Sequence, residues 1–248
     1  MNELSLYTGA GGGLLGTHLL GWRCVGAVEI EEYPCKILAA RQEDKCLPYF
    51  PIWNMDIRDF NETVAPTYKG MVDVITAGFP CTPFSNAGQQ LGQDDERNMW
   101  PSTLDCIREV RPAHLLLENV PALLTSGYFG TILGQLSDSG YDCRWRILSA
   151  AELGAPHLRK RLWLVAHAQR GRRAGSLSPG QNSGQSQNVG GRQDSTHDEP
   201  IRQGWWQVEP SLDRMAYGIS DRLGQLKSLG NAQVPSVAAR AWELLNEF

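Results

Sequence analysis

The sequence has no apolar run that approaches the ~20 residues of a membrane-crossing helix. Its first residues, MNELSLYTGAGGG, lack the basic start and the apolar stretch of a secretory signal peptide. Its 6 cysteines include no CxxC pair and no Cys/His cluster of zinc spacing. We therefore expect a cytosolic protein that holds no metal, in which most cysteines are small buried side chains of a reducing compartment.

Acidic residues are missing from one long stretch. Residues 153–193 contain seven Lys and Arg and no Asp or Glu, and because the whole chain carries −4, the remainder sums to −11. A basic segment on an acidic body is a possible surface for nucleic-acid phosphates. It is equally compatible with a solvated loop, and charge alone leaves both interpretations open.

Short apolar runs rich in Val, Ile and Leu alternate with helical patterns over the first two-thirds of the chain. This alternation predicts an α/β fold with a mainly parallel sheet that helices cover on both faces. The expected strands are 4–8, 24–30, 51–56, 72–77, 114–118, 143–149 and 161–167. The expected helices include one after the glycine-rich turn, then 33–41, 100–110 and 130–139, and one near the C-terminus.

In such sheets ligands bind beyond the carboxyl ends of the strands. The turn GAGGG (9–13), Glu29, Asp56, Cys81 and Glu118 each follow or end an expected strand, which places them together. Glycines let the backbone approach a ligand, the next helix offers free N–H groups, and Glu29 could accept hydrogen bonds from ribose hydroxyls. These features indicate a nucleoside-containing cofactor but do not distinguish NAD from S-adenosylmethionine. The alternative, a tight turn followed by a surface glutamate with no ligand, would give the same sequence pattern.

The segment GFPCTPFS (78–85) places Cys81 between two prolines that stiffen the corner after a strand. A thiol at this edge is a strong nucleophile when ionised, and the following NAGQQLGQDDERNMW is expected to close over a substrate as a lid. Glu118, in LLLENVPALL, ends the neighbouring strand beside leucines that can raise its pKa and make it a proton donor. Taken singly, a buried cysteine and a solvated glutamate are the commoner interpretations.

The combination is more specific than its parts. YTGAGG, GFPCTPFS, ENV, APHLRKR and LGNAQVP occur in that order, and together they resemble the DNA cytosine carbon-5 methyltransferases over nearly the whole chain except about 168–205. The Pro-Cys dipeptide and the Glu-Asn-Val tripeptide are the most specific elements. The resemblance implies a Rossmann-like, S-adenosylmethionine-dependent enzyme that acts on double-stranded DNA in the cytoplasm of a bacterial or phage-infected cell. We expect a monomer.

The resemblance also implies a mechanism. The Cys81 thiolate would attack carbon-6 of cytosine, and Glu118 would hold and protonate ring nitrogen 3 so that charge does not build up on the base. Carbon-5 would then accept the methyl group, and loss of its proton and of Cys81 would restore the ring. Because none of these atoms is accessible inside a duplex, the base must be flipped out.

Further residues are assigned one by one by the resemblance. Arg159 and Arg161 would hold the cytosine and a neighbouring phosphate, and an R-x-R alternation on a strand would send both guanidinium groups to one face. The expected cofactor contacts are Tyr7, Gly9, Ala10, Gly11, Gly12, Glu29 (ribose), Ile30, Asp56 (adenine amino group), Ile57, Gly78, Pro80, Asn231 and Ala232. The expected DNA contacts are Ser85, Asn119, Arg159, Arg161, Arg170, Arg172, Arg173 and Arg192.

Two positions depart from the family pattern: His157 stands where glutamine is usual before the arginine pair, and Ile30 replaces a frequent aromatic that would stack on the adenine. The Gly/Ser/Gln-rich composition after His167 predicts a long loop or a poorly ordered insertion. We therefore expect a catalytic domain over 1–166, a small irregular target-recognition domain over 167–225, and a C-terminal helix over 226–248 that completes the catalytic domain.

Three other functions stay open. The first is a catalytically silent relative that binds DNA, against which the intact Cys81 and Glu118 argue. The second is an RNA methyltransferase with the same active site, since one branch of the resembled family modifies transfer RNA. The third is a nicotinamide-dependent oxidoreductase, which would leave the Pro-Cys corner unexplained.

Overall fold

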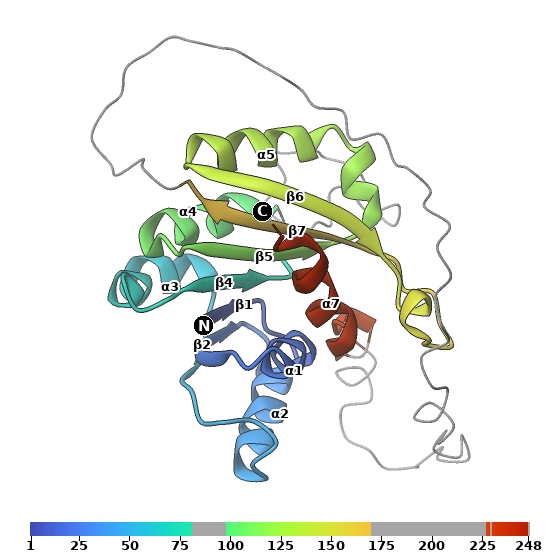
Figure 1. The fold of residues 1–248 in the computed structure, drawn as a ribbon. Coiled ribbons are helices and arrows are strands. Elements are labelled where there is room, and N and C mark those ends of the chain that lie inside the picture. The colour runs from blue at the N-terminus through green and yellow to red at the C-terminus, as the bar shows by residue number, and fades with distance from the viewer. Residues whose placement is uncertain (81–97, 170–226, 229, 248) are drawn as a thin grey trace.

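The computed structural model describes residues 1–80, 98–169, 227–228 and 230–247. Seven strands in this part of the chain form one sheet in the order β3-β2-β1-β4-β5-β7-β6 (Figure 1). Every expected strand is present, with ends shifted by up to a few residues. The strands are β1 (Asn2–Leu6), β2 (Arg23–Glu29), β3 (Ile52–Asn54), β4 (Val74–Ala77), β5 (His114–Asn119), β6 (Tyr141–Leu148) and β7 (Arg161–Ala168).

The sheet is mainly parallel, as predicted. β3, β2, β1, β4 and β5 run in one direction, whereas β7 is antiparallel to both of its neighbours, β5 and β6. The connection between β6 and β7 contains only the short 3₁₀ turn η5 (Ala151–Leu153). Without a crossover helix a strand cannot return to lie parallel to its predecessor, so β7 runs backwards.

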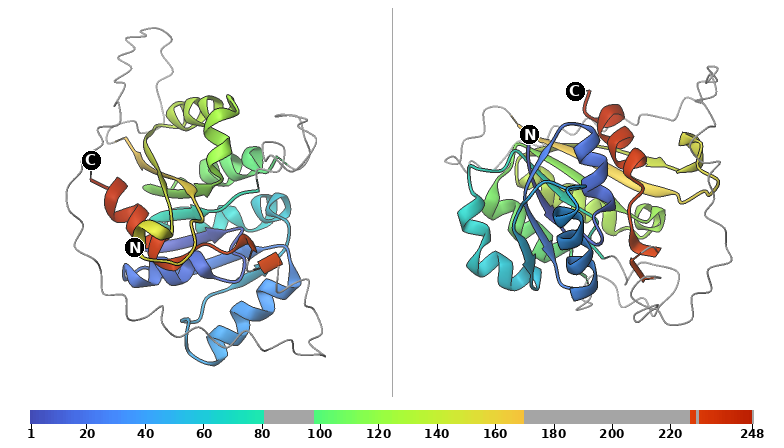
Figure 2. Two further views of the ribbon diagram at one scale, coloured as in Figure 1. Left: turned by 90° about the vertical axis from the view of Figure 1, so that its right-hand side faces the viewer. Right: turned by 90° about the horizontal axis from the view of Figure 1, so that it is seen from below.

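Helices cover both faces of the sheet (Figures 1 and 2). One face carries α1, α2 and α7, and the other carries α3, α4 and α5. The helix after β3 was not among those named from the sequence. It begins at Ile57, directly after the predicted end of that strand, and Asp56, the last residue of the predicted strand, caps it. The helices are α1 (Gly12–Leu19), α2 (Glu32–Glu43), α3 (Ile57–Thr63), α4 (Trp100–Val110), α5 (Tyr128–Asp138) and α7 (Pro235–Leu245), with 3₁₀ turns η1 (Ala65–Tyr68) and η4 (Pro121–Thr125).

Helix α7, at the end of the chain, belongs to the core of the sheet domain. It packs on α1 and on β6 and β7, and it buries one face that includes Val237, Ala241 and Leu245. Trp242 meets Trp22 edge to face, with ring centroids 4.7 Å apart. The residues just before α7 are thereby fixed beside α1. Within the described ranges, no helix is both long and apolar enough to cross a bilayer.

A carboxyl group lies inside the sheet domain, at the amino end of β1. Glu3 is buried, and its two oxygens accept hydrogen bonds from Thr17 Oγ1 at 2.5 Å and from Thr76 Oγ1 at 2.6 Å. Burial outweighs these two bonds and raises the pKa of Glu3 from about 4.5 to about 7. The ionised form is therefore disfavoured in the folded protein.

Glu3→Gln should remove a pH dependence of stability. Because folding raises the pKa of Glu3, its contribution is fully present below pH 4.5 and is lost as pH rises through about 7. The unfolding free energy of the variant should equal that of the wild type near pH 5 and exceed it by roughly 1–3 kcal/mol at pH 8. Urea unfolding of both proteins from pH 5 to 8 measures this. A difference that stays constant over that range would contradict it.

Candidate active site

The carboxyl ends of β1, β2, β4 and β5 meet at one edge of the sheet, as the sequence predicts. The N–H of Gly9, after β1, donates to Oε2 of Glu29, at the end of β2, over 2.7 Å. Asn119 Nδ2, at the end of β5, donates to the carbonyl of Phe79, after β4, over 3.0 Å. Residues from separate parts of the sequence therefore contact one another at this edge, here called the carboxyl edge.

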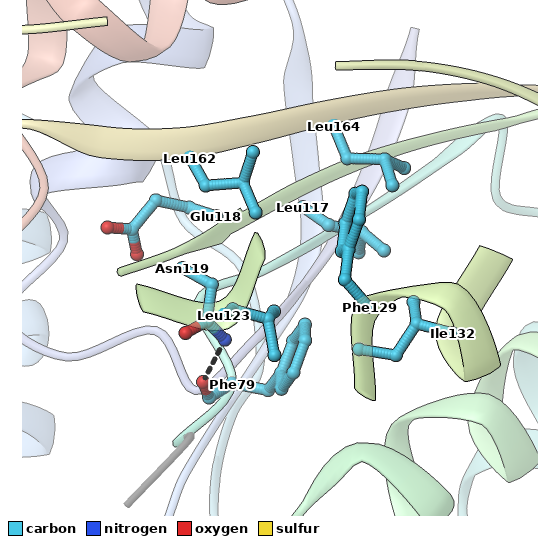
Figure 3. A pocket seen from close by; sticks show the side chains of 9 residues that line it. All are labelled: Phe79, Leu117, Glu118, Asn119, Leu123, Phe129, Ile132, Leu162 and Leu164. Atoms are coloured by element: carbon cyan, nitrogen blue, oxygen red, sulfur yellow. Dashed lines mark hydrogen bonds between the residues drawn. The ribbon is translucent and has the colours of Figure 1, made fainter. Parts of the chain in front are cut away.

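Glu118 lies at the carboxyl edge with its side chain 11% exposed. Its carboxylate points away from an apolar group formed by residues such as Leu117, Phe129 and Leu162 (Figure 3). Arg161 Nε pairs with Oε1 at 2.9 Å. Burial raises the pKa of Glu118, and Arg161, the Gln233 amide and Arg159 oppose that rise. A carboxyl with a raised pKa can carry a proton to a bound group and still be held in place.

The two arginines of HLRKR have different positions. Arg161 is the first residue of β7, whereas Arg159 lies before the strand with φ at 33°. The strand-alternation argument is therefore wrong for Arg159, because the strand starts too late to include it. Its guanidinium donates to the carbonyl of Gly230 over 2.9 Å and to that of Ala232. Arg159 thus anchors the segment before α7, and its contact with DNA stays a prediction.

Cys81 directly follows Pro80 and lies outside the described residues, as do Ser85, Arg170, Arg172, Arg173 and Arg192. The chain just before Cys81 is fixed by Asn119, whose amide donates to Phe79 and accepts the N–H of Val120 at 2.8 Å. Asn119 is 7% exposed. The structure therefore gives Asn119 a role inside the protein, holding the corner that leads to Cys81, while its expected contact with DNA is untested.

The five cysteines in the described part of the chain do not resemble nucleophiles. Burial raises the pKa of Cys35 to about 11, and that of Cys106 and of Cys143 to about 12. It also raises the pKa of Cys24, and a hydrogen bond with Asp44 raises that of the exposed Cys46. A thiol with a raised pKa is protonated at neutral pH and reacts poorly.

The glycine-rich turn has two kinds of glycine. Gly9 and Gly11 have φ values of 57° and 90°, which side chains rarely tolerate, and Gly11 precedes α1 without a side-chain cap. Gly12 and Gly13 instead face Gln233, Gly12 its backbone and Gly13 its side chain. An added Cβ at Gly12 would lie 2.3 Å from the Gln233 carbonyl oxygen, and one at Gly13 would lie 2.4 Å from its Oε1. The sequence interpretation, in which the glycines make room for a ligand, is incomplete for these two.

The other expected cofactor contacts lie around this turn in varied environments. Glu29 also accepts the N–H of Glu31 at 2.8 Å, and Asp56 caps α3 by accepting the N–H of Arg58 at 2.8 Å. Ile30 is 59% exposed. Of the remaining residues, Tyr7 and Ile57 direct their side chains into the core, Asn231 is exposed, and Ala10 and Ala232 are half-buried.

Gln233 was missed by the sequence analysis, although it lies in LGNAQVP beside Asn231 and Ala232. Its Nε2 donates to Glu118 Oε2 over 3.4 Å. A polar residue shortly before the C-terminal helix was a signal, but many such residues are solvated. Only the packing of α7 against α1 and the sheet reveals that this one points to the carboxyl edge.

Comparison with known proteins shows the family of this chain. A family model described as C-5 cytosine-specific DNA methylase matches residues 1–209. The chain belongs to this family. Among the family's relatives, Type II methyltransferase M.NgoMIV of Neisseria gonorrhoeae is 36% identical over 167 residues, which are 66% of this chain and 51% of that protein. Type II methyltransferase M.NaeI of Lentzea aerocolonigenes is 34% identical over 169 residues, 67% of this chain and 40% of that protein.

Two solved structures are similar to this chain. A prophage-encoded candidate DNA modification methyltransferase of E. coli is 26% identical with a TM-score of 0.55, over 68% of this chain and 47% of that one. DNMT2 of Spodoptera frugiperda, 22% identical with a TM-score of 0.54, shares the fold over 69% of this chain and 51% of that one. The chain spans about half of the length of the relatives it matches, or less.

Gly12→Ala should destabilise the protein, whereas Gly134→Ala should not. At Gly12 the new methyl group meets backbone of Gln233, which cannot turn away, and overpacking of this kind costs about 1–3 kcal/mol. At Gly134, inside α5, nothing lies within 4 Å of an added Cβ, so the better helix propensity of alanine should stabilise by up to about 1 kcal/mol. Urea unfolding compares the two. Equal changes in unfolding free energy for the two variants would contradict the close contact of Gly12 with Gln233.

Proposed function

We propose that the protein transfers a methyl group from S-adenosylmethionine to carbon-5 of a cytosine in duplex DNA, through a covalent bond to Cys81. The observation that carries this proposal is the pairing of Glu118 with Arg161 beside the corner Gly78–Pro80, which leads directly to Cys81. Family membership supports the reaction type. A nicotinamide oxidoreductase has no use for this carboxyl-arginine pair next to a Pro-Cys corner.

The residues act in sequence on a flipped cytosine. The Cys81 thiolate adds to carbon-6, while Glu118 delivers its proton to ring nitrogen 3, so that the electrons displaced by the sulfur do not leave an anionic ring. Arg161 holds the Glu118 carboxylate that remains. Carbon-5, now enamine-like, takes the methyl group. Transfer of the carbon-5 proton to a water molecule or hydroxide then restores the ring double bond and expels the Cys81 thiolate, and nitrogen 3 returns its proton to Glu118.

The residues at the carboxyl edge fit S-adenosylmethionine. The Glu29 carboxylate lies at the end of β2 where ribose hydroxyls could reach it, and α1 begins with no capping side chain on its N–H groups, which suits a carboxylate. Gly9 has no atom within 4 Å of its missing Cβ. Asp56, Gly11 and the exposed Ile30 would complete the site. When bound, the cofactor supplies an electrophilic methyl group.

Target recognition is assigned to 167–225, which lies almost entirely outside the described residues. Contacts to phosphate carry no sequence information, whereas arginine reads guanine in the major groove. We propose that DNA is contacted by Arg170, Arg172, Arg173 and Arg192.

Cys81→Ser should abolish methyl transfer and leave S-adenosylmethionine binding nearly intact, because a hydroxyl is a far poorer nucleophile than a thiolate. Methyl incorporation into duplex DNA and cofactor titration measure the two effects. Cys46→Ser is the matched control, since Cys46 is exposed. Wild-type enzyme should also form a lasting adduct with DNA containing 5-fluorocytosine, because fluorine cannot leave as the proton does. Turnover of Cys81→Ser within tenfold of wild type would refute the covalent route. Methylation of transfer RNA in place of DNA would refute the proposal that duplex DNA is the substrate.

Glu118→Gln should lower kcat by about 10²–10⁴-fold, because the amide still accepts or donates a hydrogen bond but delivers no proton. The wild-type rate should fall as pH rises through the pKa of Glu118, which burial raises above its ordinary value. Single-turnover rates over a pH series measure both. A variant whose defect is confined to KM would make Glu118 a binding residue only.

A further inference from the structure

The Gln233 side chain lies where the glycine turn, β4 and β5 come together. Its Nε2 donates to Glu118 Oε2 over 3.4 Å. Its Oε1 and carbonyl oxygen lie over Gly13 and Gly12, and a Cβ added to Gly78 would meet its Nε2 at 2.8 Å. Three glycines thus leave space for one glutamine, which indicates that its position is built into the fold.

The segment that carries Gln233 is held on both sides. Arg159 donates to the carbonyls of Gly230 and Ala232, the latter directly before Gln233. Two residues later α7 begins at Pro235 and buries its apolar face against the sheet. Gln233 is therefore fixed at its backbone, and its side chain has little freedom to turn away from Glu118.

The two oxygens of Glu118 have different partners. Arg161 Nε binds Oε1 at 2.9 Å, and Gln233 binds Oε2. The charged groups that act on this carboxyl in the described part of the chain are Arg161, at the start of β7, and Arg159, in the loop before it. An ion pair through one oxygen leaves the terminal torsion of a glutamate broad. A second hydrogen bond on the other oxygen fixes the plane of the carboxyl group.

We propose that Gln233 is a positioning residue for Glu118: its amide orients the carboxyl group toward the substrate and favours the ionised form that follows proton transfer. This inference rests on the proposed role of Glu118 as proton donor. Because the donor amide stabilises the carboxylate, its removal should raise the pKa of Glu118 further. The proton would then be held more tightly, by a carboxyl that is free to rotate.

Gln233→Met tests the proposal, because methionine has a similar length and no donor. Gln42→Met is the matched control: Gln42 Nε2 also donates a hydrogen bond, to the carbonyl of Phe50 at 2.9 Å, but it lies near the start of β3 and not at the carboxyl edge. Gln233→Glu is the second test variant. It keeps the size and polarity of the side chain and places a carboxylate beside Glu118, so it gives the same test if the methionine variant does not fold.

The first measurement needs no methyl transfer. The free energy of unfolding is measured against pH for the wild type and for each variant, once with Glu118 present and once with Glu118→Gln added. The difference between the two values gives the contribution of Glu118 in that protein. Because folding raises the pKa of Glu118, its contribution is greatest at low pH and is lost as pH rises through the folded pKa. In Gln233→Met and Gln233→Glu this loss should extend to higher pH, and in Gln42→Met it should coincide with the wild type.

The second measurement is the pH profile of the single-turnover rate. In Gln233→Met the plateau should fall roughly three- to tenfold, as expected for the loss of one hydrogen bond, and the basic limb should move to higher pH. Gln42→Met should leave both unchanged. Unchanged stability and rate profiles in Gln233→Met and Gln233→Glu, or a defect confined to cofactor affinity, would overturn the proposal. A normal rate for Glu118→Gln would instead refute the proposed function, and the stability measurement separates the two results.

Discussion

The burial of the Glu118 carboxylate is the constraint on which the carboxyl edge depends. A buried charge is tolerated only when it is paired and hydrogen-bonded. The reversed direction of β7 satisfies this need, because an antiparallel strand places its first residue, Arg161, at the edge where β5 ends. A parallel strand in the same position would have brought its last residue there, so the one break in the parallel order supplies the cation.

The second partner of the Glu118 carboxylate, Gln233, comes from the segment just before the C-terminal helix α7. Gln233 reaches Glu118 because α7 packs on α1 and because glycines at positions 12, 13 and 78 leave room for it. The glycine-rich turn therefore serves the fold as well as the proposed cofactor. Removing α7 would expose both the apolar face of the sheet and the charge at its edge, which gives the C-terminal segment a part in the site rather than only in stability.

Much of the fold followed from local patterns. Buried strands of the parallel part, such as β4 and β5, are continuous apolar runs and could be located as such. β6 was located too, although most of its side chains are exposed, and the expected bounds of α4 agree with the structure. Helix α3 was missed because it is short and follows β3 after only two residues. The interpretation of Arg159 failed for another reason: the expected strand already began at Arg161, so strand alternation did not apply to Arg159.

The sequence by itself determined the α/β class and the family, because these depend on residue type and on order along the chain, and it predicted the side chains that would carry the chemistry. The tertiary structure decided which groups surround Glu118. Gln233 lies 115 residues from Glu118 and Arg159 lies 73 residues from Ala232. No local periodicity reports contacts over such separations. They arise from the strand order and from the docking of the last helix, which together determine how the charge of Glu118 is balanced.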